Sequence, residues 1–219
     1  MEAVVAFGTA LLALRLAGRI AARWRARRRP ELLAWGGSLL AYAVATAALA
    51  WGAAAGWDGR AFRVYYLCGG LLTAPLLGTG SLLLWGRRWA APLALLYTGF
   101  AIGLIAFAHV HGSFAGDAIP AAQDHLGLGA RVPAIVANSL GTAAVVVVAL
   151  ATFRGRPLGN ALILLGTTLA AVGTALAGLG EAETAAFAAS AVVCLYFGFV
   201  TPRAGQRTAS VSPAPPTIS

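Results

Sequence analysis

Lysine is absent from this sequence, and all sixteen basic residues are arginine. Because no side-chain amine is present, no residue can form a Schiff base, which excludes a retinal-linked mechanism of the opsin type. The use of arginine in place of lysine, together with abundant alanine and glycine, indicates a bacterial genome of high GC content.

Charged residues of either sign are also scarce. They make up 11% of the 219 residues, whereas about a quarter of the residues of a soluble domain are charged. Hydrophobic residues make up 59%, and the mean hydropathy is +0.79. These values are typical of integral membrane proteins. The net charge of +9 comes from arginines at the ends of apolar segments, so it predicts a membrane topology and no nucleic-acid partner.

Several kinds of catalytic residue are missing from the apolar segments. The two cysteines, Cys68 and Cys194, both lie inside such segments, which predicts packing residues and neither a disulfide nor a metal motif. No carboxylate lies in the middle of an apolar segment, which argues against a proton relay. Glycine-rich phosphate loops and the H-E-x-x-H and G-x-S-x-G motifs are absent. The sequence therefore favours a protein that is not an enzyme, and it predicts no cofactor.

Apolar segments long enough to cross a bilayer dominate the chain. A spanning helix needs about 20 predominantly apolar residues, and seven segments qualify. The predicted fold is an all-α, seven-transmembrane helix bundle over residues 1–201, followed by a polar, proline-rich and disordered cytoplasmic tail at 202–219. The predicted spans are residues 3–22, 31–55, 62–86, 89–111, 131–153, 158–179 and 184–201.

Arginines are unevenly distributed over the connections between these spans. The segments that follow the first, third, fifth and seventh spans are rich in arginine, whereas the alternate connections hold most of the acidic residues. The positive-inside rule therefore places the N-terminus outside and the C-terminus in the cytoplasm. This pattern predicts a multi-pass protein of the plasma (inner) membrane.

The third span combines an apolar length with small and polar residues on every side, among them Gly69, Gly70, Thr73 and Gly78. Such a surface packs against other helices rather than against lipid. Pro75 interrupts the backbone hydrogen bonds of this span, and adjacent helices can satisfy the carbonyl that it frees. The sequence therefore predicts that the third span is the central helix of the bundle.

A weak internal repeat relates the two halves of the chain. The segment RRRP at 27–30 precedes the second span and RGRP at 154–157 precedes the sixth, while Cys68 and Cys194 recur at similar offsets. The pattern predicts two parallel three-helix units joined by the fourth span, a 3+1+3 arrangement. This order resembles that of the SWEET sugar carriers in topology, without a shared sequence motif. A chance recurrence of Arg-Pro explains the pattern equally well.

Polar side chains gather at the predicted outer ends of the spans. Arg63 can offer a forked pair of hydrogen bonds to an anionic group, and Tyr66 lies one turn further on the same face. Such groups between helices can form a ligand pocket, but residues that only meet lipid headgroups and water have the same character. The predicted ligand-binding residues of this outward-facing polar pocket are Arg63, Tyr65, Tyr66, His109, Asn138 and Glu183.

A metal or haem site is an alternative at the same end of the bundle. Histidine and carboxylate ligands suit zinc or copper. His109 and His111 point to nearly opposite sides of a helix, so they could bind one ion together only beyond its end. No tight ligand spacing is present, and no other span carries a histidine for haem. The candidate ligands are His109, His111, Asp117, Asp124 and His125.

These observations leave three functional hypotheses. The first is a small-molecule or lipid binder, or a facilitative carrier that transports such a molecule, with the outward-facing pocket as its site. The second is a non-catalytic accessory subunit or assembly factor that binds a membrane-protein partner. The third is a metal- or haem-binding protein. The lipid bilayer is a partner in all three.

Overall fold

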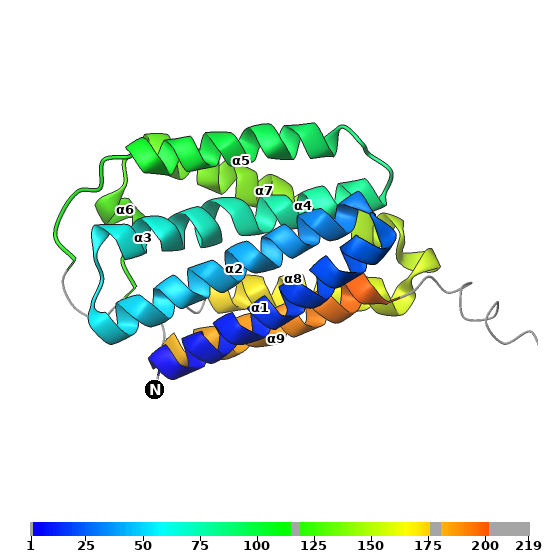
Figure 1. Ribbon diagram of the computed structural model, residues 1–219, viewed down its shortest axis with the longest axis horizontal. Helices are drawn as coiled ribbons and strands as arrows, with labels where there is room; N and C mark the ends of the chain where they lie inside the picture. The colour runs from blue at the N-terminus through cyan, green and yellow to red at the C-terminus, as the bar shows by residue number, and fades with distance from the viewer. Residues whose placement is uncertain (1, 115–118, 176–180, 202–219) are drawn as a thin grey trace, which may run out of the picture.

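The computed structural model describes residues 2–114, 119–175 and 181–201, with side chains for 3–114, 119–170 and 189–201. Within these ranges the chain is helical apart from its connections and one isolated antiparallel bridge between Val110 and Leu126. The long helices lie side by side along the long axis of the molecule (Figure 1). The elements are α1 (Glu2–Arg27), α2 (Pro30–Ala55), α3 (Gly59–Tyr65), the π-helix η1 (Tyr66–Leu72), α4 (Thr73–Leu84), α5 (Ala90–Phe107), α6 (Ala122–His125), α7 (Leu128–Ala151), the 3₁₀ turn η2 (Phe153–Gly155), α8 (Pro157–Ala175) and α9 (Glu181–Val200).

Five helices within the described residues are long and apolar enough to span a membrane. They are α1, α2, the continuous helix formed by α3, η1 and α4, and then α5 and α7. The prediction of an all-helical chain with several helices suited to crossing a membrane is confirmed. The predicted sixth and seventh spans correspond to α8 and α9, whose described apolar stretches are shorter, at Pro157–Ala170 and Ala189–Val200.

Local signals explain two helix boundaries that differ from the predicted spans. α3 begins at Gly59, before residue 62, because Asp58 caps it: its Oδ1 accepts hydrogen bonds from the backbone N–H groups of Arg60 and Ala61, at 3.0 and 2.7 Å. α5 ends at Phe107, short of residue 111, because the backbone becomes extended at the next residue. The histidines that follow therefore lie outside the helix.

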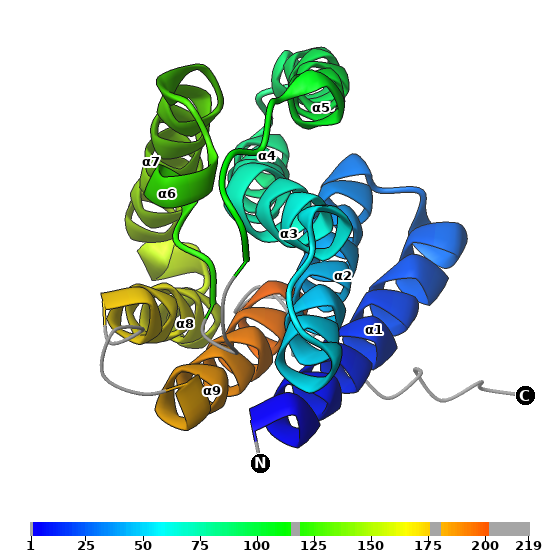
Figure 2. The same cartoon turned by 90° about the vertical axis from the view of Figure 1, so that its left-hand side faces the viewer.

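Most of the long helices form a closed ring. α1, α2, the α3–η1–α4 helix, α7, α8 and α9 contact one another in that order, and α9 contacts α1. Figure 2 looks along the helices and shows this arrangement end-on. α5 lies at the edge of the bundle, packed against η1 and α4. Neighbours in the ring are thus neighbours in sequence, except where α7 follows α4 and where α9 meets α1.

Two hydrophobic cores succeed each other along the bundle. The first is built from α1, α2, α4, α7, α8 and α9. In this core Trp35 of α2 stacks on Phe199 of α9, with 4.3 Å between the ring centroids. The second core surrounds α3, η1, α5 and α7 and contains Phe62, which is 1% exposed. The third span contributes Leu77 to the first core and Leu71 to the second, which agrees with its predicted central position.

Arginine-containing connections lie together at one end of the bundle. The connections α1–α2, α4–α5 and α7–α8 all lie at the right-hand end in Figure 1. We call this the arginine-rich end; its connections contain Arg28, Arg29, Arg87, Arg88, Arg154 and Arg156. The uneven distribution of arginine along the sequence therefore corresponds to the two ends of a single bundle.

Glycines allow α4 and α7 to approach each other closely. A Cβ atom at Gly78 would lie 2.6 Å from the carbonyl oxygen of Gly141, and a Cβ atom at Gly141 would lie 2.8 Å from the backbone nitrogen of Pro75. Real side chains do not tolerate such distances, so the contact requires glycine. On α5, by contrast, a Cβ atom at Gly99 or Gly103 would meet no atom within 4 Å.

Candidate functional site

The third span changes its helical register in the middle. Residues Tyr66–Leu72 form the π-helix η1 between two α-helical segments. Pro75 follows and has no backbone N–H, so the carbonyls of Gly70 and Leu71 lose the donor that position 75 would supply in a π- or an α-helix. The interruption therefore leaves backbone acceptors inside the bundle. Short π segments of this kind are frequent at functional sites.

Side chains from two neighbouring helices satisfy these two carbonyls. Asn138 on α7 donates from Nδ2 to the carbonyl oxygen of Gly70 at 2.5 Å. Tyr97 on α5 donates from its hydroxyl to the carbonyl oxygen of Leu71 at 3.0 Å. Adjacent helices thus compensate for Pro75, as the sequence predicts. Asn138 is one of the predicted ligand-binding residues, and its amide is used here to hold the break.

Two hydroxyl groups fix the end of the π segment. Thr73 donates from Oγ1 to the carbonyl oxygen of Cys68 at 2.7 Å. Ser38 on α2, which is 1% exposed, donates from Oγ to the carbonyl oxygen of Thr73 at 2.7 Å. With Asn138 and Tyr97, this means that α2, α5 and α7 each contribute a side chain to the same interruption.

Polar aromatic side chains lie beside the break, on the side of α2. A Cβ atom at Gly69 would lie 3.3 Å from Cβ of Ala45, so η1 packs directly against α2. Tyr42 precedes Ala45 by one turn, and its buried hydroxyl has no hydrogen-bond partner among the described residues. Tyr65 lies within electrostatic reach of Tyr42 and packs edge-on against Trp57, at 5.5 Å. An unsatisfied buried hydroxyl costs about 1–3 kcal/mol, so a ligand that reached Tyr42 would gain a donor.

Two of the predicted ligand-binding residues instead hold the connection between α5 and α7. Arg63 donates from Nη2 to the carbonyl oxygen of Ala108, directly after α5, at 2.9 Å. The hydroxyl of Tyr66 lies 3.5 Å from the carbonyl oxygen of Ala130, in the first turn of α7. The Nε atom of Arg63 is buried without a hydrogen-bond partner in the described part of the chain. Both side chains therefore face α5 and α7, whereas Tyr65 faces the side of α2.

The histidines proposed as metal ligands belong to this same connection. His125 is buried, stacks on Phe114 with 4.4 Å between ring centroids, and lies 5.3 Å from Phe62. Its Nδ1 atom is 2.9 Å from the carbonyl oxygen of His111. His109 and His111 are exposed beyond the end of α5. Among the described residues, no group of three potential metal ligands is close enough to hold an ion.

The structure brings the predicted site residues together only in part. Tyr65, Tyr66 and Asn138 lie at or next to the π segment, whereas Arg63 binds the end of α5. His109 and Asp124 are exposed in the α5–α7 connection. The side chain of Glu183 and the whole of Asp117 lie outside the described residues.

The sequence analysis did not assign Tyr42, Tyr97 or Ser38 to the site. Pro75 is the signal that identifies Tyr97, whereas Ser38 donates to the carbonyl of Thr73, which Pro75 does not free. A proline inside a span frees carbonyls about one turn before it, so polar side chains at a matching depth in other spans become candidate donors. Tyr42 gave no comparable signal, because a lone tyrosine in an apolar helix has no distinctive spacing.

The fold is an all-helical bundle with five helices suited to crossing a membrane among the described residues, and its third span carries a polar interruption. No protein-family model matches the sequence, and no match was found among curated proteins or solved structures.

Proposed function

We propose that the protein binds a small polar molecule or a lipid and acts as a facilitative carrier, with its site beside the π segment of the third span. The observation that carries this proposal is the break at Tyr66–Leu72. Carriers bind their substrates near the middle of the bilayer at interrupted helices, where backbone groups are available to a ligand. The break in this chain lies in the third span, which contributes residues to both hydrophobic cores.

A ligand can replace the hydrogen bonds that hold the free carbonyls at the break. The carbonyls of Gly70 and Leu71 are held by side chains of α7 and α5 and not by the helix itself. Interhelical hydrogen bonds of this kind in membranes contribute about 0.6 kcal/mol on average and at most about 1.7 kcal/mol. A ligand could replace them at low cost, and the α3 and α4 segments could then change their relative angle.

Tyr42 supplies a hydrogen-bonding group for the ligand in this proposal. Its hydroxyl is buried and has no partner in the described residues, and Tyr42 precedes by one turn of α2 the residue, Ala45, that contacts η1. Tyr65, from the predicted ligand-binding set, is within electrostatic reach of Tyr42. The site therefore lies deeper than the outer pocket expected from the sequence, with Arg63 and His109 towards the end opposite the arginine-rich end.

We further propose seven spans, with the N-terminus outside and the C-terminus in the cytoplasm of the plasma (inner) membrane. In support, α8 and α9 complete the ring and run alongside the five longer helices (Figures 1 and 2). The arginine-rich end is the cytoplasmic end by the positive-inside rule. The ring contains two runs of three consecutive spans. One run is α1, α2 and the α3–η1–α4 helix, and the other is α7, α8 and α9. With α5 outside the ring, this order also supports the 3+1+3 arrangement.

Thiol reactivity of Cys68 tests the carrier proposal. Cys68 lies in η1 and is partly buried. The Cys194→Ala variant, reconstituted in vesicles, is treated with a charged methanethiosulfonate that does not cross the membrane. We expect Cys68 to react, because a solute path must bring water to the break. The matched control carries Ala101→Cys in a background without Cys68 and Cys194. It should stay unreactive, because Ala101 is 0% exposed between α5 and the third span.

A Cys68 thiol that remains unmodified in vesicles, yet reacts fully after unfolding in SDS, would overturn the proposal and favour an accessory subunit. Native mass spectrometry from mild detergent then identifies the ligand class as a reproducible additional mass. We expect Tyr42→Phe, which removes only the unpartnered hydroxyl, to reduce the retention of that mass.

A further inference from the structure

One face of α1 carries charge in the middle of a helix that is otherwise suited to crossing a membrane. Arg15 and Arg19 are both exposed, and they lie one turn apart on the same side of the helix. Arg15 is close to the midpoint of Glu2–Arg27, roughly 18–20 Å from either end at the usual rise of an α-helix. It therefore lies at the middle of the span, whichever end of α1 faces the cytoplasm.

Both arginines face away from the rest of the bundle. α1 contacts α2 and α9, and Figure 2 shows the other labelled helices on one side of α1 only. The side of α1 that meets them consists of the buried residues Ala6, Ala10, Ala13, Leu16, Ala17 and Ile20. At 3.6 residues per turn, Arg15 and Arg19 lie on the opposite side of the helix.

A guanidinium at this depth needs a partner. Charged groups within spans are costly and almost always pair with one another or with backbone carbonyls. In the described part of the chain, neither Arg15 nor Arg19 forms a hydrogen bond or an ion pair, and the ion pair present there joins Arg29 to Glu31. Side chains on a helix tilt towards its N-terminus. Both guanidiniums therefore point away from the headgroups nearest to the arginines that end α1.

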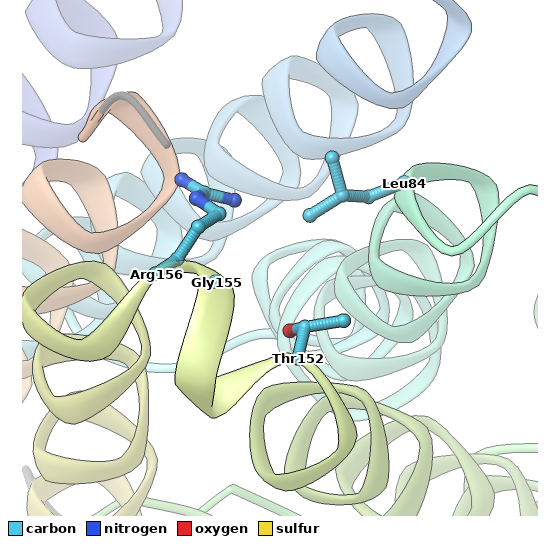
Figure 3. Close-up of a pocket in the computed structure, with 4 residues that line it drawn as sticks. All are labelled: Leu84, Thr152, Gly155 and Arg156. Atoms are coloured by element: carbon cyan, nitrogen blue, oxygen red, sulfur yellow. The ribbon is translucent and has the colours of Figure 1, made fainter. Parts of the chain in front are cut away.

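Arg156 shows how the bundle provides for a guanidinium in its interior. It is 5% exposed, and its Nη2 atom donates to three carbonyl oxygens at the end of α9, at 3.0, 3.2 and 2.7 Å. Figure 3 shows Arg156 in the wall of a cavity that it shares with Leu84 and Thr152. The outer face of α1 offers no such acceptors, because the carbonyls of a continuous helix bond to its own N–H groups. A partner for Arg15 and Arg19 must come from outside.

The exposed face of α1 has the spacing of a helix-packing seam. Residues at alternating intervals of four and three are all exposed: Val4, Gly8, Leu11, Arg15, Gly18 and Ala22. This is the repeat with which two helices pack in a left-handed pair. A Cβ atom at Gly8 or Gly18 would meet nothing within 4 Å, and small residues let the backbone of a second helix approach closely. Arg15 lies within this seam, between Leu11 and Gly18.

A second copy of this chain does not supply the opposite charge. Each acidic residue falls in the first turn of a long helix or between two long helices in the sequence: Glu2, Glu31, Asp58, Asp117, Asp124, Glu181 and Glu183. None of them is at the depth of Arg15 in a parallel or an antiparallel pair. Two α1 helices packed through this face would instead bring Arg15 close to its own copy, and like charges repel.

We propose that this face of α1 binds a span of a different membrane protein, and that this span carries an aspartate or glutamate opposite Arg15 and Arg19. The carboxylate accepts the forked hydrogen bonds of a guanidinium, which lipid chains cannot do. Gly8 and Gly18 admit the backbone of the partner on either side of the charge. The surface is separate from the break in the third span and does not depend on the carrier proposal.

The probe is a synthetic spanning peptide of leucine and alanine with one glutamate at its centre, and a matched peptide carries glutamine there. Both peptides bear a dansyl group, and energy transfer from the tryptophans of the full chain reports binding in phosphatidylcholine vesicles. Arg15→Gln/Arg19→Gln removes the two charges from the seam. The matched control Arg25→Gln/Arg27→Gln removes the same charge at the end of α1.

We expect the unmodified chain to bind the glutamate peptide about tenfold or more tightly than the glutamine peptide, as a hydrogen bond to a charged group implies. Arg15→Gln/Arg19→Gln should lose this preference, and the control should keep it. Gly18→Leu fills the seam while both arginines stay, so it should weaken binding of both peptides. Gly99→Leu, at an equally open position on α5, should leave binding unchanged. Circular dichroism checks that each variant is folded.

Equal binding of the two peptides by the unmodified chain refutes the proposal, and so does a preference that survives in Arg15→Gln/Arg19→Gln. Native mass spectrometry identifies the other occupants. Retention of phosphatidylglycerol that depends on both arginines, without a preference for the glutamate peptide, assigns them to lipid headgroups. A dimer that Gly18→Leu dissociates assigns the face to a second copy. Either of these results overturns the proposal.

Discussion

The contact between α4 and α7 provides the most direct test of the helix arrangement, through the substitution Gly141→Ala. A Cβ atom at this position would collide with the backbone of Ala74 and Pro75, at 2.6 Å from the carbonyl carbon of Ala74 and 2.8 Å from the nitrogen of Pro75. The atoms it meets belong to the helical backbone of α4. They cannot move aside as the end of a flexible side chain can.

The magnitude follows from two opposing terms. Overpacking a well-packed interior costs about 1–3 kcal/mol, and rigid backbone neighbours favour the upper part of that range. Alanine also favours a helix over glycine by about 0.5–1 kcal/mol, which partly offsets the collision. We therefore expect Gly141→Ala to lower the free energy of unfolding by about 1–2 kcal/mol. Gly99→Ala, where a Cβ atom meets nothing within 4 Å, should be neutral or stabilising.

Reversible unfolding in mixed micelles, followed by circular dichroism as SDS is added, measures both variants against the unmodified chain. Gly78→Ala provides an independent test, because its Cβ atom would lie 2.6 Å from the carbonyl oxygen of Gly141 on the other side of the same contact. If Gly141→Ala and Gly78→Ala unfold at the same SDS fraction as Gly99→Ala, the close packing of α4 and α7 is wrong.

Three further predictions concern the side-chain donors at the π segment, the role of His125 and the membrane topology. Asn138→Leu and Tyr97→Phe each leave one carbonyl of the π segment without its side-chain donor, so each should lower the free energy of unfolding by about 0.6–1.7 kcal/mol in the SDS assay. His125→Phe should be milder than His125→Ala, because only the alanine variant loses the ring stack on Phe114, worth about 0.5–1.5 kcal/mol; equal destabilisation in thermal unfolding would contradict this role. Reporter fusions should all give a cytoplasmic signal, and one clear periplasmic signal breaks the topology; the fusion points are Arg29, Arg88 and Arg156.

Much of the fold could be predicted because lipid imposes simple rules on a chain. An apolar stretch must be helical to satisfy its backbone groups, so length and hydropathy were enough to locate the long helices. Their order in the ring was not predictable, since lipid-facing and helix-facing residues are both apolar. The Gly99-x-x-x-Gly103 pattern illustrates this: its spacing suits close helix packing, yet the close contact in this chain is between Gly78 and Gly141.

The candidate site was harder to predict, and the reason is physical. Side chains near the ends of spans can bind a ligand, meet headgroups or hold a loop, and the sequence does not distinguish these roles. Arg63 has a neutral carbonyl as its partner, which no pattern of charges could indicate. Pro75 was informative because it has no backbone N–H. The carbonyls that lack this donor accept hydrogen bonds from side chains of other helices instead.

The contact between α1 and α9 has a consequence for biosynthesis. These are the first and last helices of the described chain, and the ring closes only where they meet. During translation the N-terminal helices are inserted while the segment that will cover them has not yet been made, so the inner face of α1 is exposed for most of that time. The stack of Trp35 on Phe199 is likewise completed only when α9 arrives. The ring can therefore close only late in synthesis, and a chain that stops before α9 leaves it open between α8 and α1.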